Sequence, residues 1–470
     1  MARAVAVLLL AIAVGVSAGI YVRAGRVAGP TIAILQPTSL VGRSASFEAT
    51  VEAPLGQLAT LDAAIEQDGI SYFLFSLDRP ADAEVRQDSL DRIRISRTFD
   101  RISHPELRSG NARIVVTATR PVLFGLRETS SSIAIDVEVD LDPPRLVVLS
   151  RFHYVNHGGS ELVVYRVTPP NAVSGVHVGD RFFRGYPASG AGIEATDDPG
   201  LRVAFFALLH DADLGAPIEL YARDEAGNEG RADFDYRVFP KSFRRSRIQI
   251  DDAFLRRVVP RIVERAPDLS DKEPKGTIVE LLDLYLFINR ELRRRNSETI
   301  GLLAHETTPT ILWDGPFQQL ANSQVESAFA DHRTYFHSGT EIDQQVHLGF
   351  DLASTTNAPI HAANHGTVIY ADFLGIFGNC VILDHGMGLQ SLYAHLSAIH
   401  VAVGEAVEAQ QLIGLSGQTG LAGGDHLHFT MLLEGFPVTP AEWWDPHWVE
   451  DRILRKLQEA TLTVATANRL

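Results

Sequence analysis

Cysteine is almost absent from this chain. Cys380 is the one thiol in 470 residues, so no intrachain disulfide can form. A chain of this length must then be held together by its apolar cores, which does not exclude export from the cell. Cys380 stands in an apolar strand pattern, and this predicts a buried, inert thiol.

Positive charge is also in short supply. The 42 Lys and Arg residues face 58 Asp and Glu residues, and the formal net charge is −16. This balance argues against non-specific binding to nucleic acid or anionic lipid, so we expect no nucleic-acid partner. Hydrophobic content of 45% and charged content of 21% are usual for globular proteins. The length predicts two to four domains.

A long apolar run occurs at the N-terminus. No residue from Ala4 to Val22 is charged, and arginines flank the run on both sides. About 20 apolar residues can cross a bilayer as a helix. We expect residues 1–29 to be an uncleaved signal anchor, with a cleaved signal peptide ending near Val16-Ser17-Ala18 as the alternative. Either one places the bulk of the chain outside the cytoplasm, membrane-anchored on the periplasmic side or secreted.

Two β regions follow. Apolar and polar residues alternate in Ala112–Thr119 and Ser132–Val139, and turn residues separate such runs. We expect one β-sandwich over residues 30–141 and a second over residues 142–240, including a strand from Ala232 to Val238. The second region resembles bacterial immunoglobulin-like modules in its Tyr-Ala-x-Asp-x-Ala-Gly-Asn pattern. Both are expected to be scaffolds, or binding surfaces for an envelope protein partner.

Helical periodicity replaces alternation in residues 241–309. Thr277 and Glu280 fit a capping box at a helix start. A further helix is expected over Asp251–Glu264, interrupted at Pro260. The arginine cluster from Arg290 to Arg295 is interpreted as the positively charged end of the second helix. We expect this segment to be a helical linker, or a platform for a partner.

The chemistry-bearing residues lie in the last third of the chain. His347 and Asp351 are separated by four positions, with Gly349 between them to let the backbone bend. His426 and His428 are two apart, so on a strand both face one side. Three ligands from His, Asp and Glu suit an open zinc site, and histidines beyond that number can move protons. No His-Glu-x-x-His motif occurs in the sequence, so a thermolysin-type site is not expected.

Several motifs in this part of the chain resemble the lysostaphin/LytM-like zinc endopeptidases of family M23. The matching stretches are His347-Leu348-Gly349-Phe350-Asp351, Gly378–Gly386, Tyr393-Ala394-His395-Leu396-Ser397, Gly414–Gly420 and Asp425-His426-Leu427-His428-Phe429. The resemblance implies a β-rich catalytic domain over residues 310–446. It implies Zn²⁺ ligands His347, Asp351 and His428, and catalytic histidines His395 and His426. The implied substrates are stem or cross-bridge peptides of bacterial peptidoglycan.

Two positions depart from the family pattern. Asp425 replaces a common proline and is expected to alter the electrostatics beside His426, while Cys380 replaces an aromatic or aliphatic residue. Two alternatives stay open: a non-enzymatic envelope adaptor that activates an amidase, and a zinc peptidase that acts on a protein substrate. Complete ligands argue against the adaptor.

The remaining expectations concern the rim and end of this domain. His332 and His337 are candidates to line the cleft, while other histidines are expected to make local hydrogen bonds. The tryptophans from Trp443 to Trp448 are expected to close the core, and residues 447–470 to form a short helix and a polar tail. The predicted fold class is mainly β and multidomain.

Overall fold

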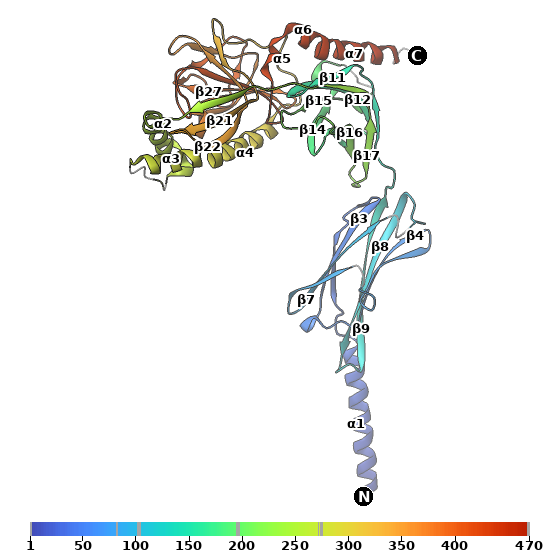
Figure 1. Ribbon diagram of the computed structural model, residues 1–470. Helices are drawn as coiled ribbons and strands as arrows, with labels where there is room; N and C mark the ends of the chain where they lie inside the picture. Colours follow the sequence, from blue (N-terminus) through green and yellow to red (C-terminus); the bar gives the residue numbers. More distant parts are fainter. Residues whose placement is uncertain are drawn as a thin grey trace. The chain divides into compact units, whose positions relative to one another are not determined.

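The computed structural model describes residues 2–80, 83–100, 105–193, 198–270, 272 and 276–467. Strands predominate over helices, which confirms the mainly β, multidomain class (Figure 1). The chain divides into two compact units. One comprises Met1–Pro144 with Arg223–Gly230, and the other comprises Arg145–Ala222 with Arg231–Leu470.

The first unit begins with the helix α1, Ala2–Ala24. Its segment Arg3–Ala24 has a mean hydropathy of 2.5 and is long and apolar enough to cross a membrane. A signal sequence near an N-terminus has the same properties. The choice between anchor and signal peptide therefore stays a prediction.

Two sheets pack against each other in the first β region. Their orders are β1-β3-β7-β6 and β2-β9-β8-β4-β5. Strands β3 and β8 bury every second residue, and Phe47 and Val116 from these strands belong to one core. The pleat points alternate side chains to opposite faces, so alternation in the sequence produces the sandwich. Its immunoglobulin-like character stays a prediction. The strands are β1 Thr31–Gln36, β2 Leu40–Val41, β3 Ser44–Glu52, β4 Thr60–Gln67, β5 Ile70–Ser76, β6 Glu84–Ser89, β7 Arg92–Asp100, β8 Gly110–Val122 and β9 Arg127–Val139.

The second β region has a different sheet order, β10-β12-β15-β14-β13-β16-β17, with a separate parallel pair β11-β18. The single strand expected from Ala232 to Val238 is wrong. β17 ends at Asp233, and β18 begins at Tyr236 and pairs with β11 instead. The strands are β10 Arg145–Val148, β11 His153–Asn156, β12 Gly159–Thr168, β13 Val173–Val178, β14 Arg181–Pro187, β15 Leu201–Leu208, β16 Ile218–Arg223, β17 Glu229–Asp233 and β18 Tyr236–Phe239.

The helical segment contains α2 (Asp252–Arg265), α3 (Ile278–Phe287), a π-helical turn η4 (Ile288–Leu292) and α4 (Arg293–Leu303). The expected interruption at Pro260 is wrong, because α2 continues through it. Val258, Val259, Ile262 and Val263 are buried around the proline. Their burial offsets the cost of about 3 kcal/mol for a proline inside a helix.

The arginine cluster does not mark a helix end, so that interpretation is wrong. The helix runs on to Leu303 and buries Ile300. Several of these arginines form ion pairs with nearby carboxylates instead. Arg290 pairs with Asp343 at 2.8 Å, and Arg294 and Arg295 both pair with Glu291 at 2.8 Å. The predicted helix start at Thr277 is confirmed, since Thr277 Oγ1 accepts from the backbone N–H of Glu280 and donates to its carboxylate.

The C-terminal region is built on one large sheet, with the path β20-β23-β31-β27-β26-β25-β29 and β32 beside β31. Two small sheets, β24-β30-β28 and β19-β21-β22, flank it. The strand β19 belongs to the segment expected to be helical. The strands are β19 Arg245–Gln249, β20 Gln324–Ser327, β21 Asp331–His337, β22 Thr340–His347, β23 Phe350–Ala353, β24 Pro359–His361, β25 Gly366–Phe373, β26 Asn379–Gly386, β27 Leu389–Leu396, β28 Ala398–Ile399, β29 Ala406–Val407, β30 Leu412–Leu415, β31 Leu427–Leu433 and β32 Phe436–Val438.

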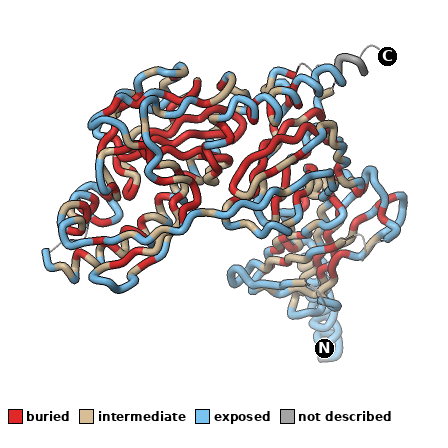
Figure 2. The backbone as a smooth tube through the Cα atoms, turned by 45° about the horizontal axis from the view of Figure 1, so that its top comes forward, coloured by how far each residue is buried: buried red, intermediate tan, exposed pale blue. Residues whose placement is uncertain are grey.

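The central strands of the large sheet are buried (Figure 2). On one face Tyr393 and Phe429 join the main core of the second unit. On the other face Leu392 and Leu432 pack with Ile300 of α4. Alternation along β31 places His428 on the same face as Leu432. The helical segment therefore packs on the face that carries the candidate site.

The second β region and the C-terminal region share one core. The Phe205 and Trp443 rings lie 5.9 Å apart, and Lys456 Nζ donates to buried Glu161 Oε1 at 2.6 Å. Trp443 and Trp448 are buried, as expected. The predicted domain limits stay predictions. The last helical stretch is longer than expected: α5 Pro440–Trp444, α6 Pro446–Val449, η7 Glu450–Leu454 and α7 Arg455–Ala467, while residues 468–470 of the predicted tail lie outside the described residues.

Candidate metal centre

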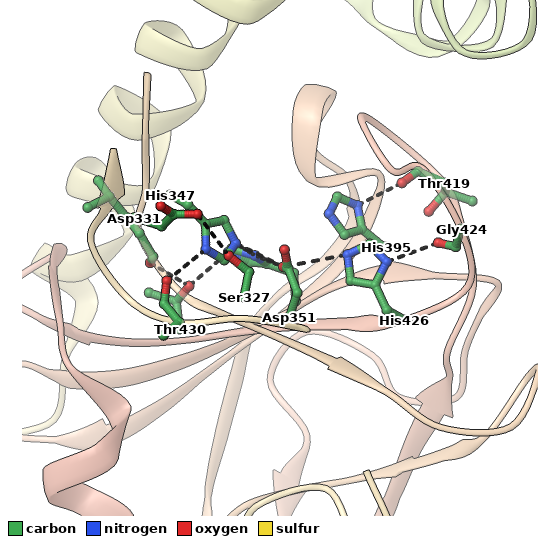
Figure 3. Close-up of polar contacts among 12 residues, drawn as sticks. Ser327, Asp331, His347, Asp351, His395, Thr419, Gly424, His426 and Thr430 are labelled. Carbon is green, nitrogen blue, oxygen red and sulfur yellow. Dashed lines mark hydrogen bonds and ion pairs between the residues drawn. The ribbon is translucent and has the colours of Figure 1, made fainter. Parts of the chain in front are cut away.

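Three predicted ligands meet at one point. His347 Nε2 lies 2.9 Å from Asp351 Oδ1 and 3.0 Å from His428 Nδ1, and His428 Nδ1 lies 2.9 Å from Asp351 Oδ1 (Figure 3). All three side chains are buried. The three ligand atoms, one oxygen and two nitrogens, therefore lie close together, although His347 and His428 are 81 positions apart in the sequence.

Strand pairing produces this convergence. His347 ends β22, and Asp351 on β23 lies directly opposite His428 on β31. Gly349 does not have a positive φ, so the expected bend is not its main contribution. A Cβ at this position would lie 2.6 Å from His428 Nε2 and 2.5 Å from Thr430 Oγ1. The glycine is required because the neighbouring strand's side chains come so close.

The second nitrogen of each ligand histidine is held by a neighbour. His347 Nδ1 donates to the carbonyl of Ala328 at 3.2 Å. His428 Nε2 lies 3.0 Å from Thr430 Oγ1, which gives its own proton to the carbonyl of Leu348. A hydroxyl has one proton, so Thr430 must accept from His428. This fixes the tautomer and leaves the Nδ1 lone pair of His428 facing the centre.

Asp351 has a further partner that the sequence motifs did not indicate. Arg333 Nη2 on β21 lies 3.0 Å from Asp351 Oδ2 and 2.7 Å from Ser327 Oγ. Burial opposes ionisation of Asp351, but the charge and hydrogen bonds of the surrounding histidines hold its pKa well below the usual range. Arg333 lies outside the motifs, at no characteristic spacing from Asp351, so the sequence could not predict this contact.

The donor set fits a divalent metal. Two imidazole nitrogens and one carboxylate oxygen lie within 4.8 Å of one another, which is the ligand chemistry of an open zinc site. Burial lowers the pKa of His428 to about 4, so its ring is neutral and offers a lone pair at neutral pH.

The two remaining histidines lie beside the three ligands. Figure 3 shows His395 and His426 together at the end of the group that also contains Thr419 and Gly424. Their rings are 4.9 Å apart, and His426 Nε2 is 3.5 Å from Asp351 Oδ1. His395 Nδ1 donates to the carbonyl of Thr419 at 2.8 Å. His426 Nδ1 donates to the carbonyl of Gly424 at 2.9 Å, so in both rings Nε2 is the nitrogen left to exchange protons.

The environment of these histidines differs. His395 has a φ of +62°, a strained conformation for a non-glycine residue that is typical of functional sites. Burial and the neighbouring His426 and His428 lower the pKa of His395 well below its usual value. Burial also acts on His426, but its hydrogen bond to the Asp351 carboxylate, the charge of that carboxylate and the bond to Gly424 together outweigh burial and raise the pKa of His426.

Asp425 has two hydrogen-bond partners outside the histidine pair. Its carboxylate accepts from Ser416 Oγ at 2.5 Å and from the backbone N–H of Asn357 at 3.1 Å. Cys380 is buried, as expected, and burial raises the pKa of its thiol. His337 pairs with Asp252 at 3.0 Å on the outer side of β21, so we find no support for its expected place in the cleft.

Two hollows are lined in part by residues of the site. One, of about 1020 Å³, is lined by His347, His428 and Thr430 together with α4. The other, of about 380 Å³, is lined by Thr419, Asp425 and α2.

Comparison with known proteins agrees with this geometry. Residues 345–440 match peptidase family M23. The DD-carboxypeptidase/endopeptidase Mpg of Neisseria meningitidis serogroup B is 38% identical over 96 residues, 20% of this chain and 22% of that protein. The peptidoglycan DD-endopeptidase ShyA of Vibrio cholerae serotype O1 is 38% identical over 92 residues, 20% of this chain and 21% of that protein.

A solved structure is also similar to part of the chain. It is the catalytic domain of the antimicrobial peptidase lysostaphin from Staphylococcus simulans, with 27% identity and a TM-score of 0.24 over 28% of this chain and 98% of that one. The similarity to the curated relatives covers about a fifth of their length. Within that span the motifs, the matched family and the buried His-Asp-His cluster agree, and the C-terminal region of this chain contains a peptidase domain of family M23.

Proposed function

We propose that this protein is a zinc-dependent endopeptidase that hydrolyses peptide bonds of bacterial peptidoglycan. The observation that carries the proposal is the buried triad of His347, Asp351 and His428 with two further histidines beside it. Relatives named peptidoglycan DD-endopeptidases support the choice of substrate. The complete ligand set favours an enzyme over an adaptor.

In this proposal His347, Asp351 and His428 hold zinc. A zinc ion bound there would polarise the scissile carbonyl and make water a stronger acid. Arg333 keeps the Asp351 carboxylate turned toward the two ligand histidines through its contact with Oδ2. Thr430 keeps the Nδ1 lone pair of His428 turned inward.

His395 and His426 carry the proton transfers. His395 donates Nδ1–H to a backbone carbonyl and has Nε2 free to accept a proton from the attacking water, whereas His426 Nε2 lies 3.5 Å from Asp351 Oδ1 and would act as a donor first. The same nitrogens, once protonated, donate to the developing oxyanion and then to the leaving amine. Two neighbouring rings divide these tasks without moving the backbone.

The proposed site of action is outside the cytoplasm, where peptidoglycan lies. The helix α1 would serve as a membrane anchor on the periplasmic side, or as a signal for export. The β regions would act as scaffold or bind an envelope protein.

The test uses the full chain, because the C-terminal region shares its core with the second β region. Wild type, His395→Ala and His428→Ala are incubated with purified peptidoglycan, and zinc is counted by mass spectrometry. We expect muropeptide release and about one zinc per chain from the wild type. His428→Ala should lose both, whereas His395→Ala should keep zinc and lose about 10²–10⁴-fold in rate.

His400→Ala is the matched control, because His400 is exposed and lies outside the site. It should keep both zinc and activity. Wild-type turnover by His395→Ala would contradict the mechanism. Zinc without any release from the wild type would favour a protein substrate, and absence of zinc would favour the adaptor.

A further inference from the structure

A row of three arginines on α2 lines one of the two hollows beside the candidate metal centre. Arg257, Arg261 and Arg265 are spaced four residues apart, so they share one face of the helix. All three line the hollow of about 380 Å³ that also contains Thr419 and Asp425. The helix precedes the matched family segment, residues 345–440, so this row is a feature of the chain outside that segment.

The two outer arginines attach α2 to the cleft. Arg257 donates to Gln418 Oε1 at 3.0 Å and to the carbonyl of Gly423 at 2.9 Å. Arg265 donates to Asn379 Oδ1 at 2.8 Å. These contacts attach the helix to the loop whose carbonyls accept hydrogen bonds from His395 and His426.

The middle arginine has no such attachment. Arg261 is exposed, and its guanidinium has no hydrogen-bond or ion-pair partner among the residues that the structure describes. The two acidic residues of the hollow are Glu264 and Asp425, and Asp425 is already bonded to Ser416. A free guanidinium between two anchored ones leaves the hollow with an excess of positive charge, in a chain whose formal net charge is −16.

We propose that Arg261 binds a carboxylate of the peptide substrate in this hollow, next to the catalytic histidines. The planar guanidinium matches a carboxylate with two parallel hydrogen bonds. Peptides of the proposed substrate class carry free carboxylates, and the hollow is lined by Thr419, whose carbonyl accepts from His395. This inference rests on the proposed endopeptidase function and names a substrate feature that the enzyme would select.

The experiment measures kcat and KM of the full chain on soluble cross-linked muropeptides. The same muropeptides, with their carboxylates converted to amides by carbodiimide and ammonia, serve as the neutral probe. For Arg261→Ala we expect KM on the free-acid substrate to rise about ten-fold, the typical loss for one charge-assisted hydrogen bond, with little change in kcat. Arg261→Lys should recover part of the affinity. On the amidated substrate, wild type and Arg261→Ala should coincide.

Arg256→Ala is the control, because Arg256 is an exposed arginine of the same helix that does not line the hollow. It removes the same charge and should leave KM unchanged. Equal KM values for wild type and Arg261→Ala on the free-acid substrate would overturn the carboxylate site alone. An equal rise in KM for Arg256→Ala would mean that the effect comes from the overall charge of the helix, and it would overturn the carboxylate site as well. If the wild type cleaves neither substrate, the proposed endopeptidase function fails first, and the carboxylate site fails with it.

Discussion

At the scale of single residues, the site depends on what each histidine does with its second nitrogen. In all four rings this nitrogen donates a hydrogen bond to an oxygen. The acceptors are the carbonyls of Ala328, Thr419 and Gly424, and the hydroxyl of Thr430. Three of these acceptors belong to the backbone, and only Thr430 can be removed by mutation. Thr430 therefore offers a direct test of how far tautomer control contributes to metal binding.

We expect Thr430→Val to weaken zinc binding about 10–100-fold, the usual effect of losing a partner behind a ligand histidine. Valine has nearly the shape of threonine, so the packing of β31 is preserved while the acceptor for His428 Nε2–H is lost. Competition with a chromophoric chelator measures the affinity. Thr430→Ser keeps the hydroxyl and should bind zinc like the wild type; equal affinity for the valine variant would show that the tautomer is held by other means.

At the scale of elements, the helix α2 acts on the loop of residues 417–424. Arg257 bonds to Gln418 and Gly423, and the neighbouring Thr419 and Gly424 supply the carbonyls that hold His395 and His426. The loop has no helix or strand between Gly417 and Gly424. Its anchorage to α2 adds to the order that Thr419 gains from its bonds to Asn379 and Leu396.

Arg257→Ala should lower kcat about ten-fold, because two charge-assisted hydrogen bonds to the loop are lost and the catalytic rings become less well oriented. Zinc content should not change, since the three ligands lie on strands β22, β23 and β31. Steady-state kinetics and metal analysis give both quantities. A loss of zinc, or an unchanged kcat, would contradict the expectation that α2 acts on catalysis by ordering this loop.

At the scale of the whole molecule, the second β region and the C-terminal region behave as one body. Glu442 of α5 reaches across to the β11–β12 hairpin, where it accepts from Asn156 Nδ2 and from the backbone N–H of Ser160, both at 2.7 Å. Gly159 makes room for it, since a Cβ there would lie 2.2 Å from Glu442 Oε1. Burial raises the pKa of Glu442 to about 7.

This raised pKa makes stability depend on pH. The folded-state pKa lies above the ordinary value of 4.5, so the stabilising effect is complete below pH 4.5 and is lost as the pH rises through 7. The free energy of unfolding should fall by on the order of 3 kcal/mol across this window from Glu442 alone. Glu442→Gln should flatten the curve, because glutamine stays neutral and the Asn156 amide can turn over to accept from it.

Denaturant unfolding between pH 5 and 8 measures the slope for wild type and variant. Glu450→Gln is the control, because Glu450 is exposed and close in sequence. It should leave the slope unchanged. Identical slopes for wild type and Glu442→Gln would mean that Glu442 stays ionised in the folded protein.

Local sequence pattern predicted the parts of this protein that local forces govern. Alternation predicted the strands of the first sandwich, and Thr277 with Glu280 predicted a helix start. Predictions failed where tertiary packing outweighs local preference. Pro260 lies inside a continuous helix because its neighbours are buried, and the arginines near Arg294 lie within a helix because acidic partners surround them.

The sequence by itself determined the five candidate site residues, since their types and their order carry the chemistry wherever the chain folds. Tertiary structure alone decided what surrounds them. Arg333 and Arg257 reach the site and its loop from a strand and a helix distant in sequence, and no spacing rule brings such pairs together. Side-chain contacts between separate elements depend on how the elements pack, and packing is a property of the whole core.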